Sequence, residues 1–517
     1  MRLIIGISEV TPGWKIVLEQ IGVPCEKVDI DQPISADAFV VLIVTHFEKK
    51  QDTIHIREYL QNGGSVLIDA SAAKNLLSQN VKRMYLKTLY VDEGPLFSQS
   101  IDCDLFQWTQ VLKTANHCRN QKGKPVIGVL SYDKGNVVIL PSGLIKSLHY
   151  AKARHKYVHS DYGERLPSEK VSKVSKGALR HIVQDSLIYL YHRRGIPFVH
   201  LWQYPKGEKN VFSFRVDTDF GTRQEIEVLY SLCREYHIQA TWFVETKSQK
   251  NWVRFYRDMK DQEIGYHCYR HRIFSDYQTN KENIVEGLNI LRNAGIHPKG
   301  YAAPFGEWNP VLGKVVQEMQ FEYSSEFELD YDDLPFYPYL EGSFSTVLQV
   351  PIHPVSIGNL RRARHTKQQY LSYYQSVIRQ KLILGDPIFI YHHPGHQGLD
   401  VFQEIFREIR QQNIPSMSMG DYSAWWKQRA CIDWIPMYKD KKLVLDVRNG
   451  DTSVYLRAIF PDKKYAIFPF EKTVDTDRLV RKNRDRSSPV YSSGMRKQDS
   501  WRLWIYRMEH IFGKMKS

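Results

Sequence analysis

The first 150 residues alternate between short apolar runs and amphipathic stretches. Residues 39–44 (FVVLIV) form a fully apolar run of the kind found in buried parallel strands. An amphipathic segment at 54–61 stops at Asn62-Gly63-Gly64, a helix-end signal, before a second apolar run at 65–69. The same alternation predicts a helix at 14–21 and strands at 3–7, 126–130 and 136–140. We therefore predict a doubly wound α/β domain over residues 1–150.

A basic segment, residues 151–205, separates this domain from the second half of the chain. It contains a polar stretch and then a predicted helix at 182–193, which ends at Gly195-Ile196-Pro197. The composition favours a helical connector.

From residue 211 onward, apolar strands alternate with amphipathic helices about seven times. The strands are predicted at 211–216, 240–244, 263–266, 300–303, 321–325, 348–352 and 388–391. Helices are predicted between them, for example at 223–236, 281–293 and 368–384. Repeated βα units of this kind predict a distorted (β/α)7 barrel of parallel strands over residues 206–429.

The C-terminal residues follow two further patterns. Alternating polar and apolar positions predict a small β module over 430–470. The tail, 471–517, is basic, and its last helix places Trp501, Trp504, Ile505 and Met508 along one side. Such a helix can bind an anionic membrane peripherally. Packing of the helix on its own protein is an equal alternative.

Composition limits the class of protein. A chain of 517 residues is too long for one core, and its net charge of +14 favours anionic partners. We expect no nucleic acid among them, because no zinc-finger or RNA-binding motif is present. The six cysteines form no CxxC pair, no run approaches the length of a membrane span, and the N-terminus is too short in apolar residues for a signal peptide. We therefore expect a cytoplasmic protein, peripheral at the inner membrane face if the tail binds lipid.

Charged residues cluster where the first barrel strand ends, in the run Phe214-Arg215-Val216-Asp217-Thr218-Asp219. Residues two apart share a strand face, so Arg215, Asp217 and Asp219 are predicted to point the same way. Three charges on one face are costly in a core without partners. A solvated edge strand is the alternative, but the apolar character of 211–216 favours a functional site.

Histidines follow two later strands. His267 and His271 are spaced i, i+4, which on a helical turn places both imidazoles on one side. Together with a carboxylate they form a three-ligand metal site that leaves positions open for water and substrate. The run Tyr391-His392-His393-Pro394 ends the last strand, and a histidine there suits a general acid near neutral pH. Strand-end histidines can equally be structural.

In this order and spacing the clusters resemble the polysaccharide deacetylase family (carbohydrate esterase family 4, the NodB homology domain) over roughly residues 206–428. The resemblance implies a distorted (β/α) barrel. It makes Asp217 the general base, Asp219, His267 and His271 the metal ligands, and His393 the general acid, with His392 a weaker candidate. Cys268 stands where the family has a hydroxyl residue.

One position departs from the family pattern. The third motif, residues 302–306, begins with Ala302 where the family has an arginine that orients the catalytic aspartate. We propose that Arg215 supplies this charge to Asp217. The metal implied is a divalent cation, with zinc the default and cobalt, nickel or iron allowed by the ligand types.

Residues 1–150 resemble the class I glutamine-amidotransferase-like fold, in a flavodoxin-like arrangement. No cysteine there lies in a G-x-C-x-G nucleophile elbow, so we interpret this domain as non-catalytic.

Together these features predict a metal-dependent N-deacetylase acting on an N-acetylated sugar in a polysaccharide or glycan precursor, such as a lipid-linked or nucleotide sugar. A deformylase or another hydrolase of non-peptide amides is the alternative within enzymes. A non-catalytic carbohydrate-binding scaffold is the alternative outside them. The sugar, the acyl group, the metal and the oligomeric state stay open.

Overall fold

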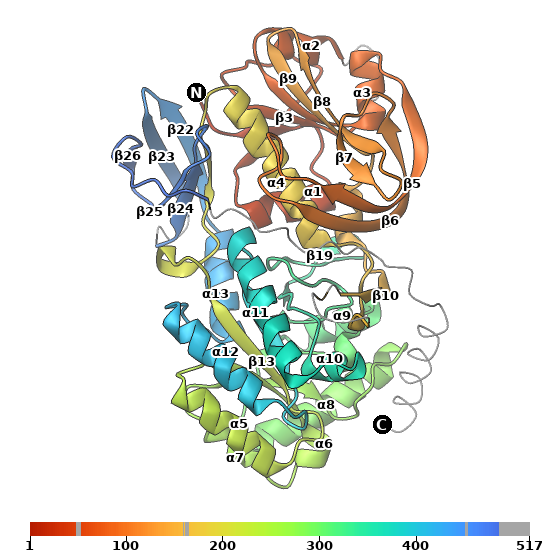
Figure 1. Cartoon of the computed structure of the whole chain (residues 1–517), viewed down its shortest axis with the longest axis vertical. Coiled ribbons are helices and arrows are strands. Elements are labelled where there is room, and N and C mark those ends of the chain that lie inside the picture. The colour runs from red at the N-terminus through yellow and green to blue at the C-terminus, as the bar shows by residue number, and fades with distance from the viewer. Residues whose placement is uncertain (48–52, 159, 161–164, 450–452, 485–517) are drawn as a thin grey trace. The chain divides into compact units, whose positions relative to one another are not determined.

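The structure is a computed structural model that describes residues 1–47, 53–158, 160, 165–449 and 453–484 (Figure 1). The chain divides into two compact units. The first contains Met1–Tyr150, Val174–Gly207 and the described part of Trp425–Val490, and the second contains Ala151–Lys173 and Glu208–Ala424. Both units are therefore assembled from separate stretches of chain, unlike the linear series of domains predicted from the sequence.

The first unit is built on a nine-stranded mixed sheet in the order β2-β1-β3-β4-β9-β8-β7-β5-β6. Its parallel part contains β1 (Ile5–Ile7), β2 (Cys25–Lys27), β3 (Val41–Val44), β4 (Ser65–Asp69) and β9 (Gly135–Leu140). Its antiparallel part contains β5 (Val81–Val91), β6 (Ile101–Leu112), β7 (His117–Asn120) and β8 (Pro125–Tyr132). The doubly wound prediction therefore describes only half of this sheet. The prediction left out the long β5–β6 pair, in which exposed and buried positions are interspersed as in a sheet with one solvated face.

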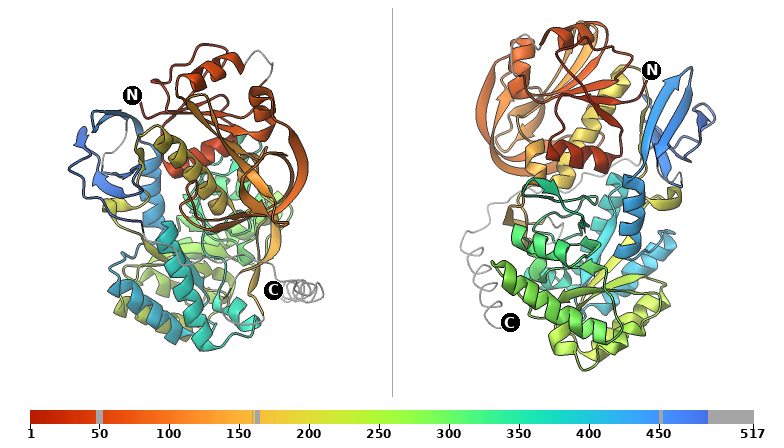
Figure 2. Two further views of the ribbon diagram at one scale, coloured as in Figure 1. Left: turned by 45° about the horizontal axis from the view of Figure 1, so that its top comes forward. Right: turned by 180° about the vertical axis from the view of Figure 1, so that it is seen from behind.

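One helix of the first unit, α1 (Pro12–Ile21), begins and ends where the sequence supplies caps. Thr11 accepts a hydrogen bond from the backbone of Trp14 at the start of α1, and Gly22 ends that helix with a φ of 81°. The other helices of this unit are α2 (Ile54–Gln61), α3 (Ala70–Leu77) and α4 (Lys176–Arg193). Helix α4 contacts β3, β4, β6 and β9, and the Ser65 hydroxyl donates to its Leu190 carbonyl at 3.2 Å (Figure 2).

The C-terminal strands belong to the first unit. Strands β22 (Asp433–Lys439), β23 (Lys442–Asn449) and β26 (Thr473–Asp475) form one small sheet. Strands β24 (Tyr455–Ile459) and β25 (Tyr465–Pro469) form another with β12 (Phe198–Leu201). The buried Arg429, in α13 (Met419–Ala430), donates to the carbonyls of Glu19, Gln20, Leu201 and Trp202. The predicted β module thus belongs to the first unit, and its strand β24 pairs with β12, which precedes the barrel in the sequence.

The second unit contains a seven-stranded parallel sheet in the order β20-β17-β16-β15-β14-β13-β21. The strands are β13 (Phe212–Asp217), β14 (Ala240–Glu245), β15 (Glu263–Cys268), β16 (Gly300–Tyr301), β17 (Tyr323–Ser324), β20 (Leu348–Gln349) and β21 (Ile388–His392). A hydrogen bond of 2.8 Å from His353 N, just after β20, to Phe389 O in β21 links the two edges of the sheet. The order is that of the predicted distorted barrel.

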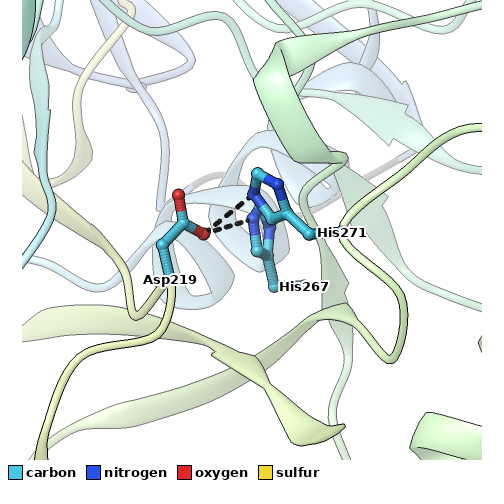
Figure 3. Close-up of side chains that lie close together, drawn as sticks. All are labelled: Asp219, His267 and His271. Atoms are coloured by element: carbon cyan, nitrogen blue, oxygen red, sulfur yellow. Dashed lines mark ion pairs between the residues drawn. The ribbon is translucent and has the colours of Figure 1, made fainter. Parts of the chain in front are cut away.

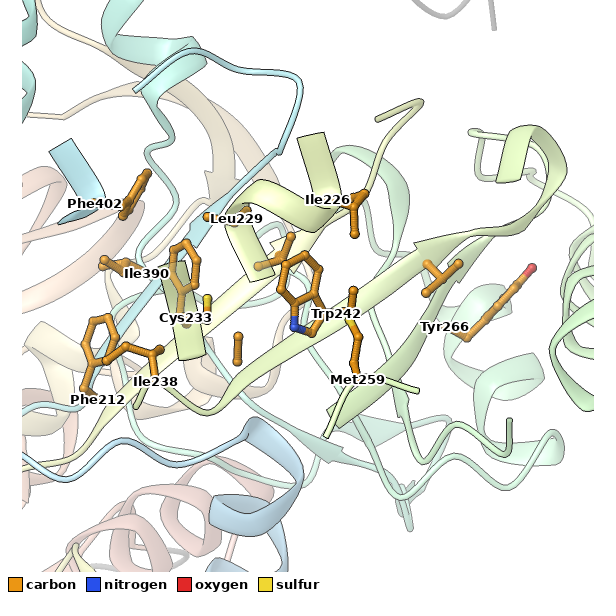
Figure 4. Close-up of a cluster of buried hydrophobic side chains, with 14 of the residues drawn as sticks. Phe212, Ile226, Leu229, Cys233, Ile238, Trp242, Met259, Tyr266, Ile390 and Phe402 are labelled. Carbon is orange, nitrogen blue, oxygen red and sulfur yellow. The ribbon is translucent and has the colours of Figure 1, made fainter. Parts of the chain in front are cut away.

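Helices follow most of these strands, and their apolar faces form the core. They include α5 (Arg223–Glu235), α8 (Tyr277–Asn293), α9 (Pro310–Glu318), α10 (Ile357–Arg362), α11 (Lys367–Leu384) and α12 (Leu399–Gln411). Phe212, Phe214 and Val216 of β13 belong to this core. Figure 4 shows Phe212 in it together with Trp242. Because strand side chains alternate, Arg215 and Asp217 project to the opposite face.

An antiparallel pair, β10 (Ala153–Tyr157) and β11 (Ser168–Ser172), also belongs to the second unit. This corrects the prediction of a helical connector over 151–205, because only α4 in that range is a long helix and it lies in the first unit. The basic tail helix around Trp501 lies outside the described residues. In the part of the chain that the structure covers, no helix has both the length and the apolar character needed to cross a bilayer.

Candidate metal centre

Three predicted ligands converge at the carboxyl ends of the parallel strands. Oδ1 of Asp219 lies 2.8 Å from Nε2 of His267 and 3.1 Å from Nε2 of His271 (Figure 3). One ligand atom from each residue lies within 4.8 Å of the other two. His267 and His271 are buried, and the Asp219 side chain is 20% exposed. The three side chains are therefore within reach of a single cation.

The local backbone differs from the prediction at the histidine pair. His267 belongs to β15, while His271 lies in the bend that follows it. A strand followed by a bend thus brings the two histidines together, and the prediction of a helical turn is wrong. Asp217 is the last residue of β13 and Asp219 lies in the next turn, so only Arg215 and Asp217 share the strand face.

The surroundings of these atoms fit a metal ion. Oδ1 of Asp219 and both Nε2 atoms are buried, and none has a hydrogen-bond partner in suitable geometry among the residues that the structure describes. Nδ1 of His267 lies 2.6 Å from the Ala302 carbonyl oxygen, so it carries the proton and leaves Nε2 as a lone-pair donor. Burial opposes ionisation of Asp219, but His271, His267 and His393 together hold its pKa well below the usual range. A carboxylate and two imidazoles suit zinc and its first-row neighbours.

Arg215 forms a buried bidentate pair with Asp217. Its Nε lies 2.6 Å from Oδ1 and its second terminal nitrogen 2.7 Å from Oδ2 of Asp217. The remaining terminal nitrogen donates to the carbonyl oxygen and hydroxyl of Ser325 at 2.6 and 3.1 Å. Both paired side chains are almost fully buried, so the guanidinium fixes the orientation of the carboxylate. At position 302 the side chain is a buried methyl group, and the backbone carbonyl orients His267.

Glu326 is a second buried acid near Arg215 that the sequence analysis missed. Its Oε1 accepts a hydrogen bond from Ala303 N at 3.3 Å, while Oε2 is buried without a partner. Burial raises the pKa of Glu326 to about 7, although Ser324 and Arg215 act in the opposite direction. The sequence offered one signal for Glu326. It follows directly after a predicted strand, as His267 does.

The two consecutive histidines at the end of β21, His392 and His393, lie in different environments. Nε2 of His393 lies 3.2 Å from Oδ2 of Asp219. The two ligand histidines approach the other carboxylate oxygen, Oδ1. His392 is buried against Phe214 and Phe402, with burial lowering its pKa well below the usual value. The structure therefore brings His393 to the candidate centre and directs His392 into the core.

A cavity of about 310 Å³ opens onto these side chains. Asp217, Asp219, His267 and His393 all line it. Its size lies at the lower end of the range for ligand pockets. Two carboxylates and two imidazoles thus line one space large enough for a small ligand.

Residues 208–324 match the family model described as polysaccharide deacetylase. This segment is similar to polysaccharide deacetylase domains. The chain accordingly carries a hydrolase domain of the class that acts on carbon–nitrogen bonds other than peptide bonds. No curated protein matches the chain.

Solved structures with similarity to the deacetylase domain include three whose similarity is distant. Peptidoglycan deacetylase PdaC from Bacillus subtilis is 17% identical, with 43% of this chain and 93% of that chain covered and a TM-score of 0.31. A family 4 carbohydrate esterase from Streptomyces lividans in complex with acetate is 16% identical (41% and 93% covered, TM-score 0.29). A CE4 family pseudoenzyme from Bacillus anthracis is 14% identical (43% and 66% covered, TM-score 0.32).

The matched segment contains some of the candidate residues and leaves out others. Asp217, Asp219, His267 and His271 fall inside the matched part of the deacetylase domain, whereas His393 follows it. The β10–β11 pair precedes it. The centre therefore combines residues inside the family match with His393, which the fold brings close to Asp219.

Proposed function

We propose that this protein is a metal-dependent N-deacetylase that hydrolyses the acetamido group of an N-acetylated sugar in a polysaccharide or glycan precursor. The observation that carries the proposal is the convergence of Asp219, His267 and His271 beside His393 and an Asp217 held by Arg215. Asp217, Asp219, His267 and His393 line one cavity. Each of these residue types has a defined task in amide hydrolysis.

Asp219, His267 and His271 would hold a divalent cation, with zinc the first choice. When bound, such a cation polarises an acyl carbonyl and makes water a better nucleophile near neutral pH. Asp217 takes a proton from the attacking water, and Arg215 keeps that carboxylate oriented toward the cavity. His393 donates a proton to the departing nitrogen. Water adds to the carbonyl carbon, the carbon–nitrogen bond breaks, and acetate and a free amino sugar are released.

The finer features of the proposal concern the partners. A lipid-linked or nucleotide sugar would account for the chain's positive charge, and a cytoplasmic location with the basic tail on an anionic membrane would be compatible with such substrates. A deformylase is the alternative with the same machinery, since it differs only in the acyl group. A scaffold without turnover is disfavoured, because Arg215 takes over the charge that Ala302 lacks.

The test combines metal analysis with product analysis on the full-length chain. We expect about one zinc-type cation per chain, release of acetate from N-acetylated sugars, and loss of activity on chelation that added cation restores. Matched N-formyl sugars distinguish the deformylase, which would release formate faster than acetate. A protein that binds no cation, or that binds one and releases neither acid, would overturn the proposal.

A further inference from the structure

One side of the cavity is formed by chain from outside the family match. His155 and Glu169, from the β10–β11 pair, line it together with Arg361 and Arg362 of α10 and with His396. The metal centre lies at the strand ends, and these residues line the same cavity. A substrate whose acyl group reaches Asp219 would therefore place the rest of its sugar among them.

The β10–β11 pair is held firmly in this place. The fully buried Asn359 of α10 donates from Nδ2 to Ser168 O at 3.1 Å and to Oε2 of Glu169 at 2.8 Å. Lys170 pairs with Glu328 at 2.6 Å, and Ser172 N donates to Phe327 O at 2.9 Å. These contacts order Glu169 before any ligand binds, as a built recognition site requires.

Helix α10 and the loop after β21 are packed against each other on the other side. A Cβ atom at Gly358 would come within 2.6 Å of the His396 ring, so the imidazole rests directly on the helix backbone. Burial, then His393 and Arg361, lower the pKa of His396 to about 3, so this imidazole is neutral. Its Nδ1 is buried and has no partner among the described residues. His396 thus offers a neutral polar group to a ligand next to the proposed acid.

Arg361 is a positively charged residue that lines the cavity. Two other cationic side chains of this unit have anionic partners, since Arg215 pairs with Asp217 and Lys170 with Glu328. Arg361 is exposed, and its side chain forms neither an ion pair nor a hydrogen bond with the described part of the chain. Its planar guanidinium suits two-point binding of a phosphate or carboxylate. The adjacent Arg362 lines the same cavity and adds positive charge.

We infer that the substrate sugar carries an anionic group, a phosphate or a carboxylate, which binds Arg361 while Glu169 accepts a hydrogen bond from a sugar hydroxyl. This inference rests on the proposed function, because it places the acyl group at Asp217 and Asp219. It makes α10 and the β10–β11 pair the elements that select the substrate. The neutral chemistry of deacetylation does not require an anionic group, so the preference is a separate property of this chain.

The experiment compares matched substrates with the metal-loaded, full-length protein. N-acetylglucosamine is the neutral reference, its 1-phosphate and 6-phosphate present phosphate, and N-acetylmuramic acid presents a carboxylate. We expect at least one anionic sugar to exceed the neutral one by about tenfold in kcat/KM, which corresponds to one charge-assisted contact. The phosphate and carboxylate arms show which anion fits.

The substitution Arg361→Gln then tests the residue. It should raise KM for the preferred anionic sugar about tenfold, leave kcat nearly unchanged, and leave the neutral sugar unaffected. Arg364→Gln, which removes the same charge from an exposed residue outside the cavity, is the matched control and should change neither. Equal kcat/KM for neutral and anionic sugars, or a preference that survives Arg361→Gln, would overturn the inference.

Binding measurements separate this failure from failure of the proposed function. If no acylated sugar is hydrolysed, the proposed function fails, and the subsite is tested by calorimetric titration of metal-free protein with N-acetylglucosamine and its phosphates. Tighter binding of a phosphate by the parent, lost in Arg361→Gln and kept in Arg364→Gln, supports the anionic subsite. Equal binding of neutral and phosphorylated sugars refutes it.

Discussion

Replacement of Arg215 by methionine removes the guanidinium while keeping most of the side-chain volume. In the native structure both members of the Arg215–Asp217 pair are almost fully buried and joined by two hydrogen bonds of 2.6 and 2.7 Å. The variant leaves the Asp217 carboxylate and the Ser325 carbonyl without their donor. The Asp217 charge is then buried without its partner, which is costly.

The expected size of the effect follows from this burial. Removing one partner of a buried pair costs about 3–5 kcal/mol, whereas removing both costs much less. For a unit of this size, such a loss lowers the unfolding midpoint by about 6–20 °C. Adding Asp217→Asn to Arg215→Met should recover much of this stability, because the uncompensated charge is gone.

Calorimetry and steady-state turnover of the parent, both single variants and the double variant form the assay. Arg215→Met should also reduce turnover, because the Asp217 carboxylate loses the two hydrogen bonds that fix its orientation. Arg215→Lys is a useful comparison, since it restores a charge without the two-point geometry. A variant Arg215→Met with unchanged turnover and a midpoint within 2 °C of the parent would refute the role assigned to Arg215.

Three further predictions concern neighbouring residues. His267→Ala should lose the cation on dialysis, as measured by elemental analysis, and a retained ion would exclude this residue as an essential ligand. Asp217→Asn should keep the cation and lose turnover by about 10²–10⁴-fold, whereas full activity would contradict its assignment as base. Burial raises the pKa of Glu326 from 4.5 to about 7, so its contribution to stability is complete below pH 4.5 and is lost as the pH rises through 7. Glu326→Gln should therefore be more stable than the parent at pH 8, by about 3 kcal/mol, and equal to it at pH 4.5, and thermal unfolding midpoints of equal pH dependence would contradict this.

The pattern of apolar and polar residues predicted individual helices and strands, because short stretches of sequence specify them. Helix α2 (Ile54–Gln61) and strand β4 (Ser65–Asp69) have the predicted bounds, because a Gly pair separates an amphipathic stretch from an apolar run. Each of the seven predicted barrel strands overlaps a strand of the parallel sheet, because each is a short apolar run between amphipathic or polar stretches. The pairing of β12 with β24 was not predictable, since it joins residues more than 250 positions apart through backbone hydrogen bonds that leave no composition signal.

The candidate site divides in the same way. Asp217, Asp219, His267 and His393 stand at the ends of parallel strands, and that topology alone brings such ends together. The prediction of a helical turn for His271 was wrong, because the i, i+4 spacing does not distinguish a helix from a strand followed by a bend. Glu169 and Arg361 reach the cavity through packing between the β10–β11 pair and α10, and their separate sequence contexts are basic and unremarkable.

The placement of the β10–β11 pair determines how the protein can be dissected. A fragment starting at residue 208 would keep every proposed metal ligand but lose the partners of Asn359, Glu328 and Phe327. Such a fragment would expose polar groups that are now paired and would leave the cavity open along one edge. A genetic truncation that retains metal binding could therefore show relaxed substrate choice or poor solubility, and neither result would describe the intact enzyme.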